Sequence, residues 1–507
     1  MKNHFYNLPQ IVTHILQKAF FKYALKKVHF YVVKLCYTKD KDFLYIEVNI
    51  LNMKRIDFEN GSVTSNILNA AIPMLVAQIL NLLYNIVDRI YIARIPDVGT
   101  AALGAVGLCF PIIMIITAFS NLFGSGGAPI FSINRGKGDS KTADDIMNTS
   151  FTMLCGSALI LMAIGMIFAR PLLVLFGASS DALGYAYPYL MIYLLGSLPS
   201  MIASGMNPFI NAQGYATVGM LSVAIGAVSN IILDPIFIFV FGLGIKGAAT
   251  ATIISQILSA LFVFYFLHQK AELKVRLLHL NEIPSCIGHA KNIIGLGTVS
   301  FMMQLTSSLV NICCNSVLSV TGGDVYISVM TIVSSVRQIV ETPIGAMNDG
   351  TSPIISYNYG AVRPKRVKKA IFVLACLVLI YTGITWSIIL LAPELLIGIF
   401  SSDKTLIKDA IPALKLYFMA FIFMDLQYIG QTVFKSLNKK KHAIFFSLLR
   451  KVFIVVPLTY FMPYVLHMGT DGVFMAEPVS NLIGGSLCFI TMLVTVMPEL
   501  KKMETAK

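Results

Sequence analysis

Long apolar runs separated by short polar segments dominate this chain from residue 64 onward. A membrane helix needs about 20 consecutive, mostly apolar residues, and twelve of the runs reach that length. They cover residues 64–92, 101–133, 143–169, 181–210, 215–241, 246–267, 290–320, 325–358, 366–391, 406–435, 442–466 and 472–498. Several contain Pro or Gly, which membrane helices tolerate when neighbouring helices satisfy the freed backbone groups. The pattern predicts twelve transmembrane helices.

The two halves of the chain carry related sequences. Residues 129–136 are PIFSINRG, and residues 353–360, which lie 224 positions later, are PIISYNYG. A long internal duplication in an apolar chain is typical of transporters built from two lobes with the substrate path between them. We therefore expect an all-α integral membrane protein with twelve transmembrane helices in two pseudo-symmetric six-helix lobes around a central cleft.

Charged residues in the loops predict the orientation of the chain. Lys and Arg gather in alternate loops, at residues 135–141, 268–291, 363–369 and 435–441, and in the tail at 501–502. Basic loops stay in the cytoplasm, so we expect both termini inside the cell and the two lobes in the same orientation. The expected divisions are an N-terminal cytoplasmic extension 1–63, an N-lobe 64–270, a cytoplasmic linker 271–289, a C-lobe 290–498 and a cytoplasmic tail 499–507.

The N-terminal extension differs from the rest of the chain. Residues 1–52 are rich in Lys and contain no apolar run of span length. They also lack the compact apolar core and small-residue cleavage site of a signal peptide. We expect that Met53 is the true start or that residues 1–52 are dispensable.

Composition narrows the class of protein further. Only 13% of the residues are charged, against about 25% in soluble domains, and 56% are hydrophobic. The net charge of +14 comes from loop Lys and Arg, without the aromatic and basic strand pattern that stacks nucleic-acid bases. The eight cysteines form no CxxC pair, and no His or carboxylate cluster has metal-ligand spacing. No phosphate-binding loop is present either. We expect a lipid-embedded protein that is not an enzyme and uses no metal, cofactor or nucleic acid.

Ionisable and polar residues inside the runs are the candidate functional groups, because they are costly in a membrane. Asp88 in the first run and Asp234 in the fifth lie at similar depths below the outer face. Asn230 lies one helical turn from Asp234 on the same face, and Thr252 in the sixth run lies at about the same level. Four polar side chains from three helices at one depth predict a cation site. Their oxygens suit both H⁺ and Na⁺, and Na⁺ would bind at Asp88, Asn230 and Asp234.

Structural roles are the alternatives for these residues. Asp88 has Arg89 and Arg94 nearby as partners for an interfacial ion pair. Asp234 precedes Pro235, where a carboxylate accepts hydrogen bonds at a helix break. Tyrosines recur every four residues in the fourth run, at positions 185, 189 and 193, and such a stripe serves packing as well as binding.

Polar stripes on two helices indicate a cleft lining. Residues spaced three or four apart lie on one helix face, and a polar face in a membrane helix must contact protein or water. The first run carries Gln78, Asn81 and Asn85 in this spacing, and the seventh carries Gln304, Ser307 and Asn311. We expect both stripes to line the substrate cleft.

Ionisable residues of the second half form a secondary set of candidates. Arg337 and Glu341 lie four residues apart in the eighth run and can neutralise each other as a structural pair. Asp425 lies in the tenth run. Glu341 and Asp425 are therefore weaker candidates for a coupling site.

Several of these stretches resemble the MATE (multidrug and toxic compound extrusion) transporters, in particular their bacterial MepA-like branch. The stretches that carry the resemblance are residues 73–88, 229–235, 244–252 and 356–361. The resemblance implies two six-helix lobes that alternate between inward-facing and outward-facing states. It places an N-lobe cation site on Asp88, Asn230, Asp234 and Thr252, with Tyr189 as the matching tyrosine. Many relatives carry an acidic residue in the seventh run, but residues 304–308 are QLTSS, so a C-lobe cation site like theirs is not expected.

The resemblance and the residue pattern together predict a secondary active multidrug efflux transporter of the bacterial cell membrane. It would export organic cations or drugs by H⁺ or Na⁺ antiport, as a monomer, through a cleft rich in Met and aromatic residues. One alternative is a flippase or exporter of lipid-linked saccharide with a related fold. That protein would need cationic residues facing the cleft, and Arg337 is the only clear basic residue in the middle of a run. The other alternative is a membrane protein without transport activity.

Overall fold

The computed structural model describes residues 55–279, 281–400 and 403–505, and all regular secondary structure in these residues is helical. The expectations for residues 1–52 lie outside the described residues. The first half contains α3 (Val63–Ala93), α4 (Gly99–Gly136), α5 (Ser140–Leu175), α6 (Ser180–Leu195), α7 (Ser197–Ala212), α8 (Ala216–Pro235) and α9 (Ile245–Tyr265). The second half contains α10 (Ile283–Thr321), α11 (Gly323–Gly360), α12 (Pro364–Leu391), α13 (Pro393–Ile397), α14 (Lys404–Tyr417), α15 (Phe421–Ser436), α16 (Lys440–Leu448), α17 (Val456–Tyr464), α18 (Gly469–Ser480) and α19 (Ser486–Thr505).

Each of the twelve predicted spans corresponds to one helix or to one series of joined helices. Within the described residues, nine continuous helical segments are long and apolar enough to cross a membrane, and the pair α6 and α7, bent by 55°, makes a tenth. The eighth span, α11, and the tenth, α14 with α15, are less apolar. They contain Arg337, Glu341 and Asp425, and Lys404 and Lys408 near the start of α14. The protein is thus an all-α, multi-pass membrane protein, as the apolar pattern predicted.

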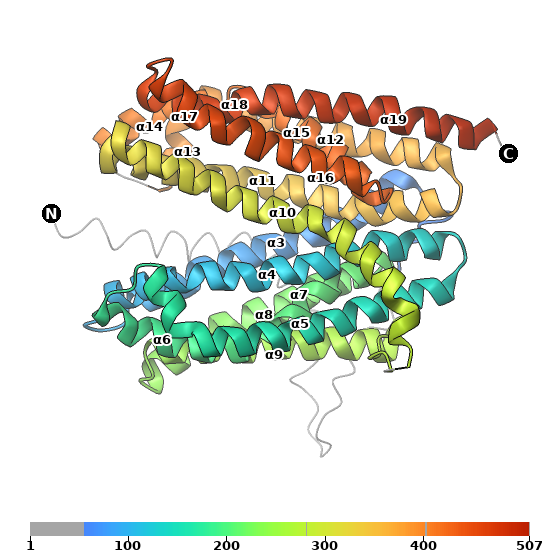
Figure 1. Ribbon diagram of the computed structural model, residues 1–507, viewed down its shortest axis with the longest axis horizontal. Helices are drawn as coiled ribbons and strands as arrows, with labels where there is room; N and C mark the ends of the chain where they lie inside the picture. Colours follow the sequence, from blue (N-terminus) through green and yellow to red (C-terminus); the bar gives the residue numbers. More distant parts are fainter. Residues whose placement is uncertain (1–54, 280, 401–402, 506–507) are drawn as a thin grey trace, which may run out of the picture. The chain divides into compact units, whose positions relative to one another are not determined.

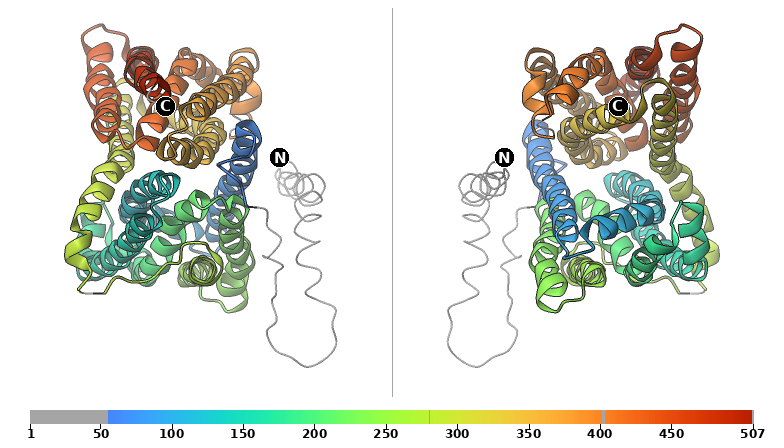
Figure 2. Two further views of the ribbon diagram at one scale, coloured as in Figure 1. Left: turned by 90° about the vertical axis from the view of Figure 1, so that its right-hand side faces the viewer. Right: turned by 90° about the vertical axis from the view of Figure 1, so that its left-hand side faces the viewer.

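Two groups of helices make up residues 55–505, as Figures 1 and 2 show. We name α3–α9 the N-lobe and α10–α19 the C-lobe. Helix α10 begins beside the N-lobe and crosses to the C-lobe (Figure 1). It packs along α4, while α11 packs against α3 and α4, so four long helices form the contact between the lobes. The duplicated motif ends both α4 and α11.

Helices α4 and α11 approach each other closely at the duplicated motif. A Cβ atom at Gly136 would collide with the carbonyl oxygen of Tyr357, and one at Gly360 would collide with that of Ile133. Because only glycine lets two backbones approach this closely, the repeated glycine is required by the crossing. The duplication therefore specifies a symmetric contact between the lobes at the ends of α4 and α11.

Polar contacts reinforce this crossing. The Arg135 guanidinium pairs with Glu272 (2.7 Å) and donates a hydrogen bond to the Ala212 carbonyl (2.7 Å). The same group lies 5.8 Å from the centre of the Tyr357 ring on the other lobe. One side chain thus connects α4, α7, α11 and the segment between the lobes.

The segment between α9 and α10 is attached to the N-lobe. The backbone N–H groups of Leu273 and Arg276 donate hydrogen bonds to the side chains of Gln213 and Asn148, at 3.0 and 2.9 Å. The Arg276 guanidinium also donates to the Glu282 carboxylate, and this interaction lowers the pKa of Glu282 to about 2. The segment is therefore held along α5 and the end of α7.

Candidate functional site

Asp234, Asn230 and Thr252 form a buried cluster between α8 and α9. Neighbouring turns of α8 place Asn230 and Asp234 on one face, and α9 packs along that face. The Asn230 amide donates to Asp234 Oδ1 (3.2 Å) and to Thr252 Oγ1 (3.3 Å), and the Thr252 hydroxyl donates to the Ala248 carbonyl (3.0 Å). Asp234 is 0% exposed and Asn230 2% exposed. The structure thus brings three of the predicted site residues together.

Asp88 completes this group from a third helix. Helix α3 packs along α8, and the carboxyl groups of Asp88 and Asp234 lie within electrostatic range of each other. Among the described residues, three buried acceptor atoms here have no hydrogen-bond donor: Asp88 Oδ1, Asp234 Oδ2 and Asn230 Oδ1. An unpaired buried polar atom costs about 1–3 kcal/mol, so three in one place indicate a site made for a ligand. An all-oxygen set fits a proton or a hard cation.

The structural alternatives account for less of this arrangement. No ion pair found in the described part of the chain includes Asp88, and the Arg89 guanidinium instead lies 5.9 Å from the centre of the Phe110 ring. At Asp234 a change of helix does occur, since α8 ends at Pro235 and a π-helical segment follows. A structural role at this break, however, would pair the carboxylate oxygens with donors, and Asp234 Oδ2 has none.

Tyrosines surround the carboxyl pair. Tyr189 and Tyr193 of α6 are buried with their rings stacked at 6.2 Å, and the Gln256 amide donates to the Tyr193 hydroxyl (3.4 Å). Tyr189 lies within electrostatic range of Asp88, as the resemblance implied. The sequence analysis missed Tyr84, which lies near both Asp88 and Asp234. Its position one turn before Asp88 on α3 is the feature that would have identified it.

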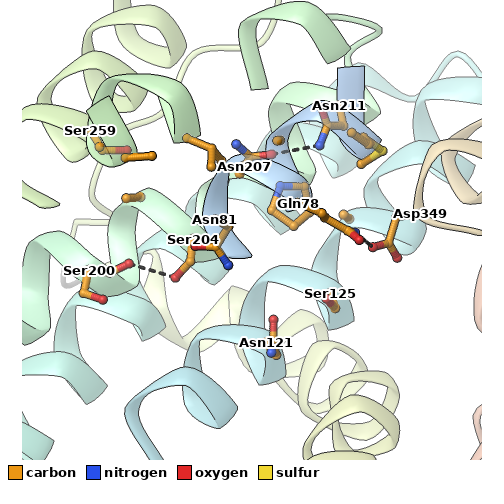
Figure 3. A pocket seen from close by; sticks show the side chains of 18 of the residues that line it. Gln78, Asn81, Asn121, Ser125, Ser200, Ser204, Asn207, Asn211, Ser259 and Asp349 are labelled. Carbon is orange, nitrogen blue, oxygen red and sulfur yellow. Dashed lines mark hydrogen bonds between the residues drawn. The ribbon is translucent and has the colours of Figure 1, made fainter. Parts of the chain in front are cut away.

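A cavity of about 400 Å³ opens beside this group, and Asn230, Thr252 and Tyr84 belong to its wall. Of the predicted cleft residues, Gln78 and Asn81 line it, and the Gln78 amide donates to Asp349 Oδ2 (3.4 Å). Figure 3 shows further amides and hydroxyls that the sequence analysis missed: Asn121, Ser125, Ser200, Ser204, Asn207 and Asn211. Asn207 and Asn211 lie four apart on α7, a spacing that could have revealed them. The prediction of a cleft rich in Met and aromatics was wrong for this cavity, where Met74 and Tyr84 are the Met and aromatic residues of the described wall.

The other predicted cleft residues do not reach this cavity. The Asn85 amide donates to the Asn81 carbonyl on its own helix (2.6 Å). On α10, the Gln304 amide lies 3.1 Å from the Met114 sulfur, and Asn311 is exposed. Ser307 lines a separate cavity in the C-lobe. The stripes on α3 and α10 are therefore not equivalent in this structure, although their sequence spacing is the same.

A second cavity, of about 70 Å³, lies in the C-lobe. Arg337 and Glu341 form the predicted ion pair and both line it. Asp425 is 0% exposed and does not line it. Arg450 and Lys451 also line this cavity, and each is 5% exposed. The statement that Arg337 is the only clear basic residue in the middle of a run was therefore wrong, since Arg450 and Lys451 lie inside the eleventh predicted run, 442–466.

Comparison with known proteins agrees with this architecture. The MatE family profile matches residues 73–236 and 300–461, one segment in each lobe. The multidrug export protein MepA of Staphylococcus saprophyticus is 25% identical over 449 residues, which cover 87% of this chain and 94% of that protein. The MepA protein of Staphylococcus aureus strain MRSA252 is 24% identical over 450 residues, with the same coverage.

Solved structures share the fold. The crystal structure of MATE in complex with MaD3S has a TM-score of 0.82 at 23% identity, and the match covers 89% of this chain and 99% of that one. The duplicated motif, the two lobes and the family match over both of them lead to one conclusion: the chain belongs to the MatE family.

Proposed function

We propose that this protein is a secondary active transporter of the bacterial cell membrane that exports organic cations or drugs in exchange for H⁺ or Na⁺. The family membership and the names of the MepA relatives support multidrug export. One observation carries the coupling. Asn230 and Thr252 belong both to the proposed cation site, with Asp88 and Asp234, and to the wall of the large cavity. A bound cation and a bound substrate therefore act on the same side chains. The protein works as a monomer with both termini in the cytoplasm.

Competition follows from this shared wall. Asp88 and Asp234 resist carrying two negative charges in low-dielectric surroundings, so one proton or one Na⁺ stabilises the pair. When a cation binds and Asn230 turns its oxygen toward it, the amide leaves Asp234, and this change reshapes the cavity wall. Bound cation and bound substrate then favour different arrangements of α3, α8 and α9, which is the differential affinity that exchange requires.

The flippase alternative requires cationic residues that face the cleft, and the C-lobe holds more buried basic residues than the sequence suggested. Arg337, Arg450 and Lys451 line a cavity of about 70 Å³. This volume is little more than twice the share of one water molecule in the liquid, about 30 Å³, and too small for a pyrophosphate-linked sugar. Glu341 and Glu477 also offset two of the three positive charges. Export of organic cations therefore remains the better supported function.

Efflux from vesicles tests the proposal. Purified protein in vesicles, loaded with a fluorescent organic cation, receives a pH gradient or a Na⁺ gradient in separate experiments. We expect efflux driven by one gradient in the wild type, and a loss of at least tenfold in both Asp88→Asn and Asp234→Asn. Asp181→Asn is the matched control, because Asp181 is an exposed carboxylate at the start of α6.

Each result has a defined meaning. Wild-type protein without gradient-driven efflux contradicts the proposed exchange. Efflux that survives both substitutions shows that coupling does not occur at Asp88 and Asp234, and directs the search to Glu341 and Asp425.

A further inference from the structure

The C-lobe contains a buried cluster of charges that the proposed exchange does not use. One oxygen of Glu477, Oε1, lies within ion-pair distance of three cationic groups: Arg337 Nη1 (3.2 Å), Arg450 Nη1 (3.0 Å) and Lys451 Nζ (2.8 Å). Glu477 is 3% exposed, and Arg337 also pairs with Glu341. Helices α11 and α18 and the π-helical segment Leu449–Val455 bring these residues together.

The charges in this cluster do not balance. Three cationic side chains face two carboxylates, which leaves an excess of one positive charge if all are ionised. A third carboxyl, Asp425, lies within electrostatic range of Glu341, but it is not part of the cavity wall and makes none of the ion pairs found in the described residues. Burying an uncompensated charge is costly, so the excess calls for an anionic partner.

Unpaired donors show where that partner would bind. Within the described residues, Arg450 Nε and Gln431 Nε2 are buried without an acceptor, and both residues line the cavity of about 70 Å³. They are 5% and 4% exposed, respectively. The Ser447 hydroxyl on the same wall also lacks a partner. Gln427 Oε1 is an unpaired acceptor on this wall, so donors and one acceptor meet there.

We propose that this C-lobe cavity binds a small monovalent anion, held by Arg450, Lys451 and Gln431. Arg450 Nε and Gln431 Nε2 donate the hydrogen bonds, Ser447 supplies a third donor, and Lys451 contributes charge. The volume admits a chloride ion or one carboxylate group. The ligand is either a free ion or the carboxylate of a transported molecule, and the second source rests on the proposed export function.

Thermal unfolding of the purified protein in detergent tests the site without any transport. The probe is chloride, added as NaCl in place of sodium 2-(N-morpholino)ethanesulfonate, a bulky anion without a carboxylate, so that Na⁺ stays constant. A ligand that binds only the folded state raises the Tm as its concentration rises. We expect a saturable rise with chloride in the wild type and a chloride requirement at least fivefold higher in Gln431→Leu. The same substitution in the N-lobe cavity, Gln256→Leu, should leave the chloride response unchanged.

A second variant, expected to bind chloride more strongly, keeps the test valid if Gln431→Leu does not fold. Glu341→Gln removes a negative charge from the cavity wall, and we expect it to lower the chloride concentration for half-maximal effect. Equal Tm values in chloride and in the bulky sulfonate overturn the proposal, because the unpaired donors then bind water rather than an anion. An unchanged chloride response in both Gln431→Leu and Glu341→Gln also overturns it.

Transport distinguishes the two sources of the anion. In loaded vesicles, a zwitterionic drug that carries a carboxylate is compared with its methyl ester. A KM that rises in Gln431→Leu for the acid alone identifies the cargo carboxylate as the ligand. Equal KM changes for acid and ester, together with the lost chloride response, identify a free anion. If no efflux occurs at all, the export proposal fails while the chloride titration still decides the anion site.

Discussion

At the scale of single residues, unpaired oxygens distinguish the proposed cation site from a polar cluster that serves only stability. The Asn230 amide donates hydrogen bonds to Asp234 and Thr252. Its own oxygen stays unpaired, next to unpaired oxygens of Asp88 and Asp234. A cluster built only for stability would pair these acceptors with donors. The surplus of acceptors is the feature that favours a cation.

Thr252→Val tests the hydroxyl in this group. Valine has almost the same shape but cannot accept from Asn230, so we expect the ion concentration for half-maximal efflux to rise about tenfold, the effect of about 1.4 kcal/mol. Thr250→Val is the control, because the Thr250 hydroxyl on the same helix donates only to the Lys246 carbonyl (2.8 Å). Equal efflux curves for wild type and Thr252→Val would remove Thr252 from the cation site.

At this scale, depth along the predicted spans was enough to indicate which polar side chains lie close together. Asp88, Asn230, Asp234 and Thr252 lie at one level in the predicted spans, and the structure brings them together. The sequence analysis missed Arg450 and Lys451, although both lie inside the eleventh predicted run, 442–466. Burial of Arg450 depends on Glu477, which lies 27 residues away in the chain.

At the scale of elements, the duplicated motif explains why the two lobes meet where they do. Gly136 and Gly360 occupy corresponding places at the ends of α4 and α11, and each admits the backbone of the other helix. Larger side chains would push the helices apart at this end. The motif is therefore a packing device as well as a family feature.

Gly360→Ala tests the crossing. The added methyl group collides with the Ile133 carbonyl, and we expect it to weaken the contact by about 1–3 kcal/mol and to increase labelling of cysteines placed at the ends of α4 and α11. Gly383→Ala in α12 is the matched control, because no atom lies within 4 Å of the added group. There we expect stability to hold or rise by up to about 1 kcal/mol. Identical labelling of both variants would contradict a tight crossing.

At the scale of the whole molecule, transport by alternating access requires the lobes to separate at the end where α4 and α11 now cross. Arg135 links both lobes and the segment between them through Glu272, Ala212 and Tyr357. Of these contacts, the one between Arg135 and Tyr357 joins the two lobes and must break during each cycle, whereas those with Glu272 and Ala212 can persist.

Crosslinking tests this movement. In a background with the native cysteines replaced, Arg135→Cys and Tyr357→Cys are joined by a cleavable reagent that reacts with thiols. We expect efflux to stop after crosslinking and to return after reduction, since the two residues lie on different lobes. The pair Arg135→Cys and Ala212→Cys, within the N-lobe, should transport after crosslinking. Full efflux with the first pair crosslinked would show that this end stays closed during transport.

The sequence by itself determined the class of protein, the twelve spans and the two-lobe duplication. The lipid bilayer acts directly on the sequence, because spanning segments must be mostly apolar. Lys and Arg in the loops affect the orientation of the chain in the membrane. Only the tertiary structure decided which polar residues share a site. The stripes on α3 and α10 have the same spacing, yet Gln78 and Asn81 line the large cavity and Asn311 is exposed. Spacing places side chains on a helix face, but the neighbour that this face meets depends on how the helices pack.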